Sequence, residues 1–170
     1  MKHILIPGSF DPVTLGHLSL FERASAMFEK VTVAVMHNRE KQYLFTPEER
    51  AAFIRAGTEH LNNVEVVTSD EMLFEFCART GYFHILKGIR NAEDLAYENL
   101  QADWNHDKDP RIETIYLPSR KELDGISSTL VRNNLERGQS IREFTGPVLE
   151  KLIKQAYDTR HTERRPDPIR

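Results

Sequence analysis

The segment from Pro7 to His17, Pro-Gly-Ser-Phe-Asp-Pro-Val-Thr-Leu-Gly-His, carries the residues best suited to binding a phosphate. It follows a short apolar run, and Gly8 is expected to let the backbone turn sharply there. Thr14 is a residue type that caps helices, which would place Gly16 and His17 in the first turn of a helix. The amides and dipole of a helix N-terminus favour an anion, and an imidazole there can donate to a phosphoryl oxygen. The segment is neither a Walker loop nor the three-glycine dinucleotide fingerprint.

Two further segments hold cations and hydroxyl groups after apolar runs. Lys87 and Arg90 flank Gly88, so two positive charges can face the same edge of a ligand, and the planar fork of Arg suits phosphate oxygens. Three hydroxyl residues, Ser127–Thr129, follow Gly125 and open a predicted helix, where they could hold a β- or γ-phosphate. Taken singly, each segment also fits a simpler interpretation, a solvated charge pair or a serine-capped helix.

Short apolar runs alternate with longer amphipathic ones along the chain. The pattern predicts strands at 4–6, 31–36, 64–67, 83–87 and 112–117, and helices at 15–28, 46–61, 70–79, 92–106, 127–137 and 147–157. This alternation indicates an α/β fold, a Rossmann-like parallel five-stranded sheet with helices on both faces, followed by C-terminal helices. Ligands of such sheets bind beyond the carboxyl ends of the strands, which is where the three segments lie.

The domain organisation that we predict is simple. Residues 1–157 are expected to form one domain, and residues 158–170, which lack apolar periodicity and contain two prolines, are expected to form a short, flexible, disordered tail.

The chain has 170 residues and a formal net charge of -3, which argues against a general nucleic-acid binder. Its single cysteine, Cys77, excludes an internal disulfide framework and a multi-cysteine metal site.

No apolar run approaches the ~20 residues that a membrane span requires. The N-terminal residues have no long apolar stretch and no small-residue cleavage site, so we expect no signal peptide and a cytoplasmic location.

The first segment resembles the signature of the nucleotidyltransferase superfamily, whose second half reads Thr/His-x-Gly-His and is here Thr14 to His17. The longer string is similar to that of bacterial phosphopantetheine adenylyltransferases, which make dephospho-coenzyme A from ATP and phosphopantetheine. The second segment resembles the family's Arg-Gly-Leu/Ile-Arg followed by Asp-x-x-Tyr-Glu, with Lys87 in place of the first Arg. The third resembles Ile-Ser-Ser-Ser/Thr-x-Val-Lys/Arg. The resemblance extends from residue 1 to about 157.

The resemblance implies an adenylyl-transferring enzyme in which His17, Lys41 and Arg90 are catalytic. It implies an ATP site formed by Ser9, Phe10, Gly16, His17, Gly88, Ile89, Arg90, Glu98, Leu123, Asp124, Gly125, Ile126, Ser127, Ser128 and Thr129. It implies a phosphopantetheine site formed by Ser9, Lys41, Leu73, Lys87 and Asn105. It also implies Mg²⁺ bound mainly through ATP, and a homo-oligomer, a hexamer in this family.

Two other functions stay open at this point. A nucleotidyltransferase of the same fold acting on another phosphorylated acceptor, such as nicotinamide mononucleotide or a sugar or polyol phosphate, is motivated by Lys87 and by the pair Asp103 and Trp104. A non-catalytic nucleotide sensor or scaffold is the alternative from a different class. It is disfavoured because His17, Lys41 and Arg90 are all present.

Overall fold

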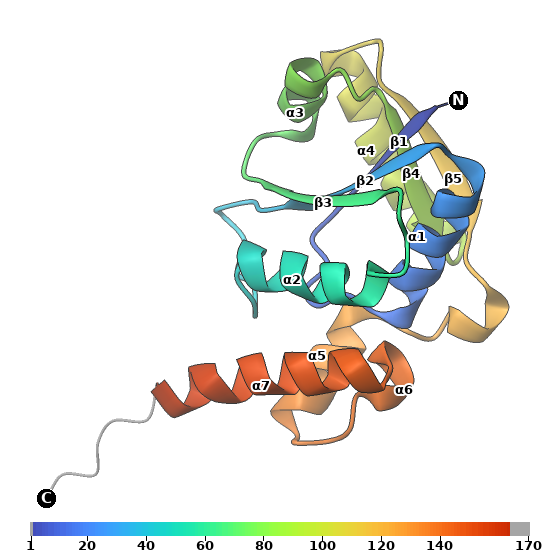
Figure 1. Cartoon of the computed structure of the whole chain (residues 1–170). Helices are drawn as coiled ribbons and strands as arrows, with labels where there is room; N and C mark the ends of the chain where they lie inside the picture. The colour runs from blue at the N-terminus through green and yellow to red at the C-terminus, as the bar shows by residue number, and fades with distance from the viewer. Residues whose placement is uncertain (1, 164–170) are drawn as a thin grey trace, which may run out of the picture.

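Five parallel strands form one sheet in the order β3-β2-β1-β4-β5 in the computed structural model, which describes residues 2–163 (Figure 1). The strands are β1 (His3–Gly8), β2 (Lys30–Met36), β3 (Val64–Ser69), β4 (His84–Ile89) and β5 (Glu113–Pro118). The chain leaves β1 on one side toward β2 and later returns on the other side as β4. This reversal opens a crevice at the carboxyl ends of β1 and β4, the usual ligand site of such sheets. The predicted fold class is confirmed.

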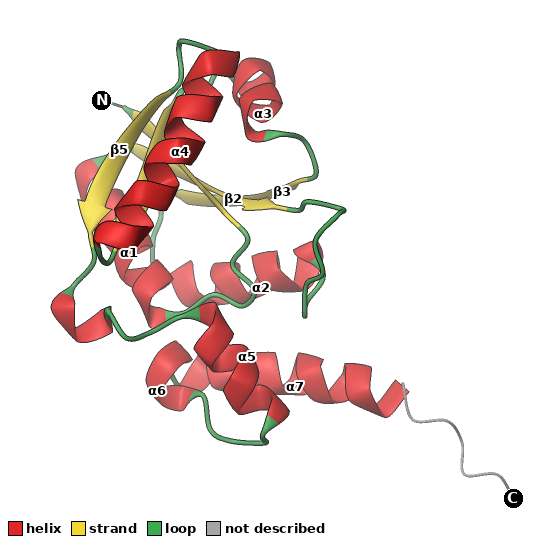
Figure 2. Cartoon of the chain, turned by 180° about the vertical axis from the view of Figure 1, so that it is seen from behind, coloured by secondary structure: helices red, strands yellow, loops and turns green. Residues whose placement is uncertain are grey.

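Helices cover both faces of the sheet, as predicted. The helices α1 (Leu15–Met27) and α2 (Pro47–Thr58) lie on one face, and α3 (Leu73–Thr80) and α4 (Ala92–Lys108) lie on the other (Figures 1 and 2). Side chains alternate between the two faces along β1: Ile4 and Ile6 join the core under α1 and α2, whereas Leu5 joins a smaller core with Phe76 of α3. None of the helices among the described residues is long and apolar enough to cross a membrane.

The ends of the predicted helices depend on local capping chemistry. Thr46 and Glu49 form the reciprocal capping box at the start of α2: the backbone N–H of Glu49 donates to Thr46 Oγ1, and that of Thr46 donates to Glu49 Oε2. Gly81 ends α3 in the left-handed region, with φ of 76°.

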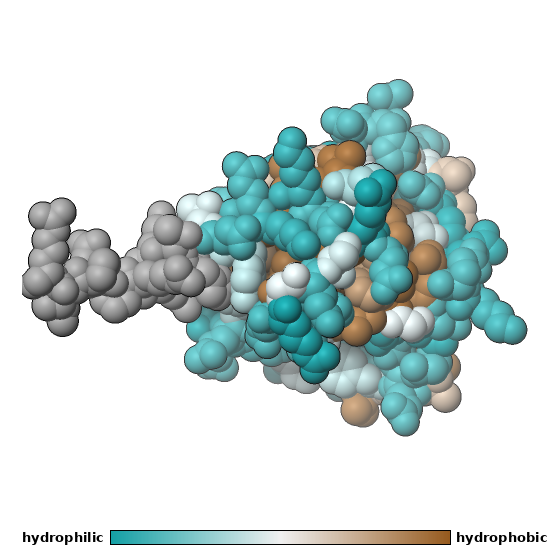
Figure 3. Space-filling model, turned by 90° about the horizontal axis from the view of Figure 1, so that it is seen from below, coloured by the Kyte–Doolittle hydropathy of each residue, from teal (hydrophilic) through white to brown (hydrophobic). Residues whose placement is uncertain are grey.

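Three C-terminal helices, α5 (Ser128–Glu136), α6 (Arg142–Thr145) and α7 (Pro147–Glu163), follow a short 3₁₀ turn, η1 (Lys121–Leu123). They pack beside α1 and α2, and α7 runs along α2 (Figure 1). Neither η1 nor α6 was predicted. Seen from the α7 side, most of the surface is hydrophilic, with hydrophobic residues in scattered places between (Figure 3).

The helix predicted at 147–157 is longer in the structure, because α7 continues through residues 158–163. This stretch lacks the apolar periodicity of a core helix, but it extends a helix that is already anchored by buried Leu149 and Ile153. Arg160 then pairs with Glu49 at 2.5 Å, which ties the last turns of α7 to the start of α2. Residues 164–170 of the expected tail lie outside the described residues.

Candidate active site

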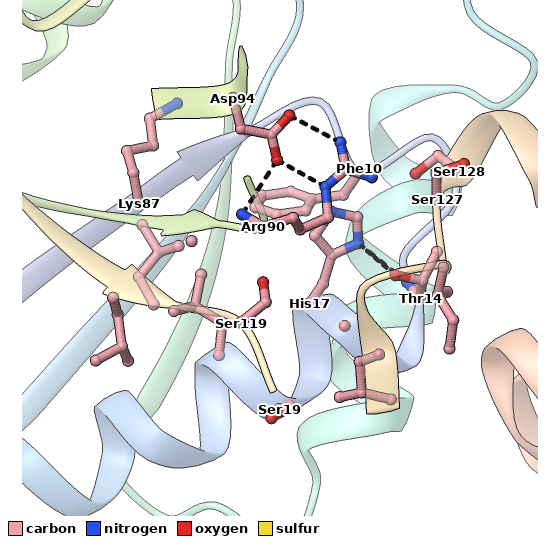
Figure 4. Close-up of a pocket in the computed structure, with 18 of the residues that line it drawn as sticks. Phe10, Thr14, His17, Ser19, Lys87, Arg90, Asp94, Ser119, Ser127 and Ser128 are labelled. Carbon is pink, nitrogen blue, oxygen red and sulfur yellow. Dashed lines mark hydrogen bonds and ion pairs between the residues drawn. The ribbon is translucent and has the colours of Figure 1, made fainter. Parts of the chain in front are cut away.

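A cavity of about 380 Å³ opens at the carboxyl ends of β1, β4 and β5 (Figure 4). It brings together all three segments that the sequence singled out. The predicted site residues that line it are Ser9, Phe10, Gly16, His17, Lys87, Gly88, Arg90, Glu98, Leu123, Ile126, Ser127, Ser128 and Thr129. The predicted juxtaposition of an imidazole, cations and hydroxyl groups is therefore present in the fold.

A second, smaller cavity of about 40 Å³ lies between α4 and the strands β4 and β5. Leu73 and Asn105, both predicted for the acceptor site, line it, and Lys87 and Glu98 line both cavities. Lys87 Nζ and Glu98 Oε2 are 3.1 Å apart, so this ion pair stands where the two cavities meet.

Four predicted residues line neither cavity. Ile89, Asp124 and Gly125 lie next to residues that do. Lys41 is exposed in the segment between β2 and α2, where its backbone N–H donates to Asn38 O.

His17 is held in one tautomer by the start of α1. The backbone N–H of Thr14 donates to His17 Nδ1 at 3.1 Å, so Nδ1 is the acceptor and the ring proton lies on Nε2. Burial, assisted by the positive charge of Arg90, lowers the pKa of His17 to about 4. The imidazole is therefore neutral at pH 7, and its Nε2–H is available as a donor.

Phe10 shapes this part of the wall. Its ring packs edge-on against His17, with 5.1 Å between ring centroids, and its backbone has a φ of 49°, in the left-handed region. A Cβ on Gly8 would lie 2.7 Å from the Phe10 ring. Gly8 is thus needed for this close approach, and the sharp turn that we expected at Gly8 comes later, because Gly8 still belongs to β1. The turn after β1 lies at Asp11 and Pro12, whose shared peptide bond is cis.

Arg90 is oriented by Asp94, one turn along the chain in α4. The guanidinium donates through Nε to Asp94 Oδ2 at 2.7 Å and through Nη2 to Oδ1 at 3.0 Å, and the Arg90 backbone N–H also donates to Oδ2. These bonds raise the pKa of Arg90 and lower the pKa of Asp94. Figure 4 shows Arg90 and His17 pointing into the same space.

The hydroxyl groups at the start of α5 are partly engaged within the protein. Ser127 Oγ caps the helix by accepting from Leu130 N–H, and Ser128 Oγ donates to Pro12 O at 2.7 Å. Thr129 Oγ1 accepts from the Arg132 guanidinium. The Ser128 proton is thus committed to Pro12, whereas these bonds leave the protons of Ser127 and Thr129 for a ligand.

Comparisons with known proteins agree with this geometry. A family model described as cytidylyltransferase-like matches residues 5–134. The phosphopantetheine adenylyltransferase of Streptococcus pneumoniae is 45% identical over 156 residues, which cover 91% of this chain and 96% of that protein. The enzyme of the same name from Symbiobacterium thermophilum is 40% identical over 157 residues, 92% of this chain and 97% of that protein. The chain belongs to the phosphopantetheine adenylyltransferase family.

A solved structure supports the fold of this family member. Plasmodium falciparum nicotinic acid mononucleotide adenylyltransferase complexed with NaAD superposes with a TM-score of 0.64 at 17% identity, covering 93% of this chain and 98% of that one. At this identity the likeness shows the fold alone. The alternative of another phosphorylated acceptor is not favoured, because the relatives that match over nine-tenths of the chain carry the phosphopantetheine name.

Sequence reasoning missed several residues that line the larger cavity of this phosphopantetheine adenylyltransferase family member. They are Ser19, Leu20 and Arg23 of α1, Asp94 of α4, and Leu117, Ser119 and Arg120 at the end of β5. The first three lie three, four and seven residues after Gly16, so helical periodicity could have placed them on the same face. Arg23 also donates to Pro118 O at 2.7 Å, which ties α1 to the end of β5.

Proposed function

We propose that this chain transfers the adenylyl group of ATP to phosphopantetheine, giving dephospho-coenzyme A and pyrophosphate. Membership of the family supports the reaction. The structural observation that carries the proposal is the neutral Nε2–H donor of His17 on the same cavity wall as the Arg90 guanidinium. A phosphate chain that lies in this cavity meets both groups.

The reaction is an in-line displacement at the α-phosphorus. An oxygen of the acceptor phosphate forms the new bond, the bond to pyrophosphate breaks, and charge develops on the non-bridging oxygens and on the leaving group. In this proposal His17 donates to the α-phosphate, while Arg90 and the start of α5 hold the β- and γ-phosphates. Lys41 bridges the acceptor phosphate and the α-phosphate. The protein positions the groups and stabilises charge, and it forms no covalent intermediate.

Asn105 supports an amide-containing acceptor. Its side chain is only 6% exposed, and its Nδ2 donates to Gln101 O at 2.8 Å. Among the described residues its Oδ1 has no hydrogen-bond partner. A buried acceptor without a partner costs about 1–3 kcal/mol, and an N–H of a ligand would satisfy it. The pantetheine arm carries such amides, and its phosphate end would lie toward Lys87 and Glu98.

We also propose that Mg²⁺ accompanies the nucleotide, held mainly by phosphate oxygens and water. The two carboxylates on the cavity wall, Asp94 and Glu98, are each engaged with a cation, Arg90 and Lys87. These two carboxylates are therefore poorly suited to form a metal site of the protein's own. They fit better a metal ion that is already held by the triphosphate. When bound, the metal would neutralise charge on the phosphates.

The assembly and location are proposals of the same kind. We propose a homo-oligomer, a hexamer by resemblance to the family. The outward side chains of α4, Leu95, Tyr97, Leu100 and Trp104, are exposed large hydrophobics that contact between copies would cover. For the location we propose the cytoplasm, in keeping with the proposed reaction.

An acceptor panel tests the proposed function. The full chain is incubated with Mg²⁺ and ATP or CTP, and with phosphopantetheine, nicotinamide mononucleotide or glycerol phosphate, while pyrophosphate release is followed. Release with ATP and phosphopantetheine, with dephospho-coenzyme A identified by mass, is the expected result. Turnover with another acceptor alone would refute the proposal, and ATP binding without pyrophosphate release from any acceptor would indicate a nucleotide sensor.

A further inference from the structure

Arg50, in the first turns of α2, is a charged side chain with no solvent exposure. Burying a guanidinium is costly unless its N–H groups are hydrogen-bonded. Here Nη1 donates to Ser9 O at 2.6 Å, Nη2 donates to His37 Nδ1 at 2.9 Å, and Nε donates to Thr46 O at 3.3 Å. An apolar residue would fill the same space at a lower desolvation cost, so the directed hydrogen bonds are what distinguish arginine here.

These bonds join two segments of the active site that are far apart in the sequence. Ser9 lies in the turn after β1 and lines the nucleotide cavity. His37 is the first residue after β2 and begins the segment that carries Lys41. Arg50 therefore fixes the start of the Lys41 segment against the turn that holds Ser9.

The other end of the Lys41 segment is fixed to the same turn. The carboxylate of Asp11, only 6% exposed, accepts from the backbone N–H groups of Leu44 and Phe45 at 2.8 and 2.9 Å. Tyr43 strengthens the base of the segment, because its ring lies 4.3 Å from the Arg50 guanidinium and its hydroxyl accepts from Asn38 N–H. Lys41 is thus at the tip of a segment whose two ends are clamped beside Ser9.

We propose that Arg50 is a positioning residue for adenylyl transfer: by binding Ser9 and His37 together, it sets where Lys41 stands relative to the nucleotide cavity. The inference rests on the proposed function, which gives Lys41 its role. It predicts that loss of the Arg50 contacts lowers turnover through Lys41, with ATP affinity unchanged. A displacement of about 1 Å in a reacting group can cost about 100-fold in rate.

A double-mutant cycle with Lys41→Ala and Arg50→Lys tests this coupling. Arg50→Lys keeps the charge but cannot reach Ser9 and His37 together, so we expect kcat to fall by about 10- to 100-fold. In the Lys41→Ala background the same change should lower kcat by less than about 2-fold, the scatter of uncoupled changes. If the two losses in kcat multiply, Arg50 does not act through Lys41 and the inference is wrong.

Two controls separate positioning from folding. Arg55→Lys alters another arginine of α2 that donates to a backbone carbonyl, that of Val66, and should leave kcat unchanged. His37→Ala removes the acceptor on the Lys41 segment while keeping Arg50, so it should lower kcat and couple to Lys41→Ala even if Arg50→Lys unfolds the chain. ATP binding by calorimetry and the melting temperature are measured for every variant.

The outcome also distinguishes this inference from the proposed function. If the wild-type chain releases no pyrophosphate with phosphopantetheine, the proposed function has failed. Hydrogen exchange then tests the clamp directly: Arg50→Lys should speed exchange of the Asn38 and Lys41 amides, whose hydrogen bonds lie in the segment that begins at His37, and Arg55→Lys should not. Unchanged exchange at these amides would overturn the clamp even in an active enzyme.

Discussion

His17 and Arg90 both line the larger cavity, and the positive charge of Arg90 adds to burial in lowering the pKa of His17 to about 4. The site therefore pairs a permanent cation with a neutral hydrogen-bond donor, where two cations would repel each other. The Thr14 N–H bond to Nδ1 selects the tautomer that this arrangement needs. Burial and the neighbouring charge keep His17 neutral, and the helix start leaves its one ring proton on Nε2.

The titration of His17 in the ligand-free chain is the first prediction. The folded pKa of about 4 lies below the ordinary value of 6.5. Between these values the unfolded chain binds a proton that the folded chain does not, so the free energy of unfolding contributed by His17 falls as pH drops from about 6.5 to about 4. Histidine NMR spectra, assigned with His17→Gln, should show a midpoint near 4. A midpoint near 6.5 would contradict the described environment.

Removing the imidazole should affect the chemical step most. In the proposed reaction His17→Ala takes away a donor to charge that develops in the transition state, so kcat should fall by about 100- to 1000-fold while the ATP dissociation constant changes little. Steady-state kinetics and calorimetry measure the two quantities. His60→Ala removes an exposed histidine near Glu22 and serves as the control. Equal losses of kcat and ATP affinity would remove the role assigned to His17.

Lys87 is expected to govern use of the acceptor. Lys87→Gln leaves Glu98 without its cation and should raise the KM for phosphopantetheine about 10-fold or more, with the KM for ATP little changed. Lys87→Arg, which introduces the family residue, should keep phosphopantetheine turnover. The matched control is Lys30→Gln, since Lys30 forms a comparable pair with Glu65 on the surface. If only the KM for ATP rose, Lys87 would serve the nucleotide and not the acceptor, and the prediction would be wrong.

Asp94 is expected to act through Arg90. Asp94→Asn removes the charge of a carboxylate that makes three hydrogen bonds to Arg90, so the guanidinium loses its fixed orientation. The KM for ATP should rise by about 10-fold, the value of one lost charge-assisted bond. Asp109→Asn breaks a similar exposed pair with Arg111 and should leave the KM for ATP as in the wild type. An Asp94→Asn enzyme with an unchanged KM for ATP would show that Arg90 needs no partner.

The C-terminal helix is expected to be part of the folded domain. Ile153 of α7 has no exposure, so Ile153→Ala should lower the free energy of unfolding by about 2–5 kcal/mol. Val148, on the same helix, is 62% exposed, and Val148→Ala should change it by less than about 0.5 kcal/mol. Chemical denaturation measures both. Similar small effects would mean that α7 does not contribute to the core.

The sheet could be predicted because its strands contain short apolar runs, of which Val31–Val35 is buried and rich in β-branched residues. The start of α2 could be predicted because Thr46 and Glu49 have the spacing of a capping box. The sequence could not predict α6, which is only four residues long, or the helical end of α7, which depends on Arg160 meeting Glu49 across the fold. Both depend on tertiary contacts that local patterns do not encode.

In the site, too, residue types could be predicted from the sequence, whereas their environment could not. The residue types of His17 and Arg90 indicated phosphate chemistry, but the neutral state of His17 follows from burial, which only the fold provides. Asp94 and Arg23 also line the cavity. Asp94 belongs to a family string and Arg23 lies at helical spacing from Gly16, but only the fold shows that both side chains reach this cavity. The buried contacts of Arg50 join three segments, and no spacing rule predicts such a junction.

Lys87 and Glu98 belong to both cavities, so in the proposed function the two substrates meet at one ion pair. A phosphate in one cavity that draws Lys87 away from Glu98 changes the charge that this pair presents to the other cavity. Thermodynamic linkage then requires reciprocity: whatever factor the acceptor imposes on the affinity for nucleotide, the nucleotide imposes on the affinity for acceptor.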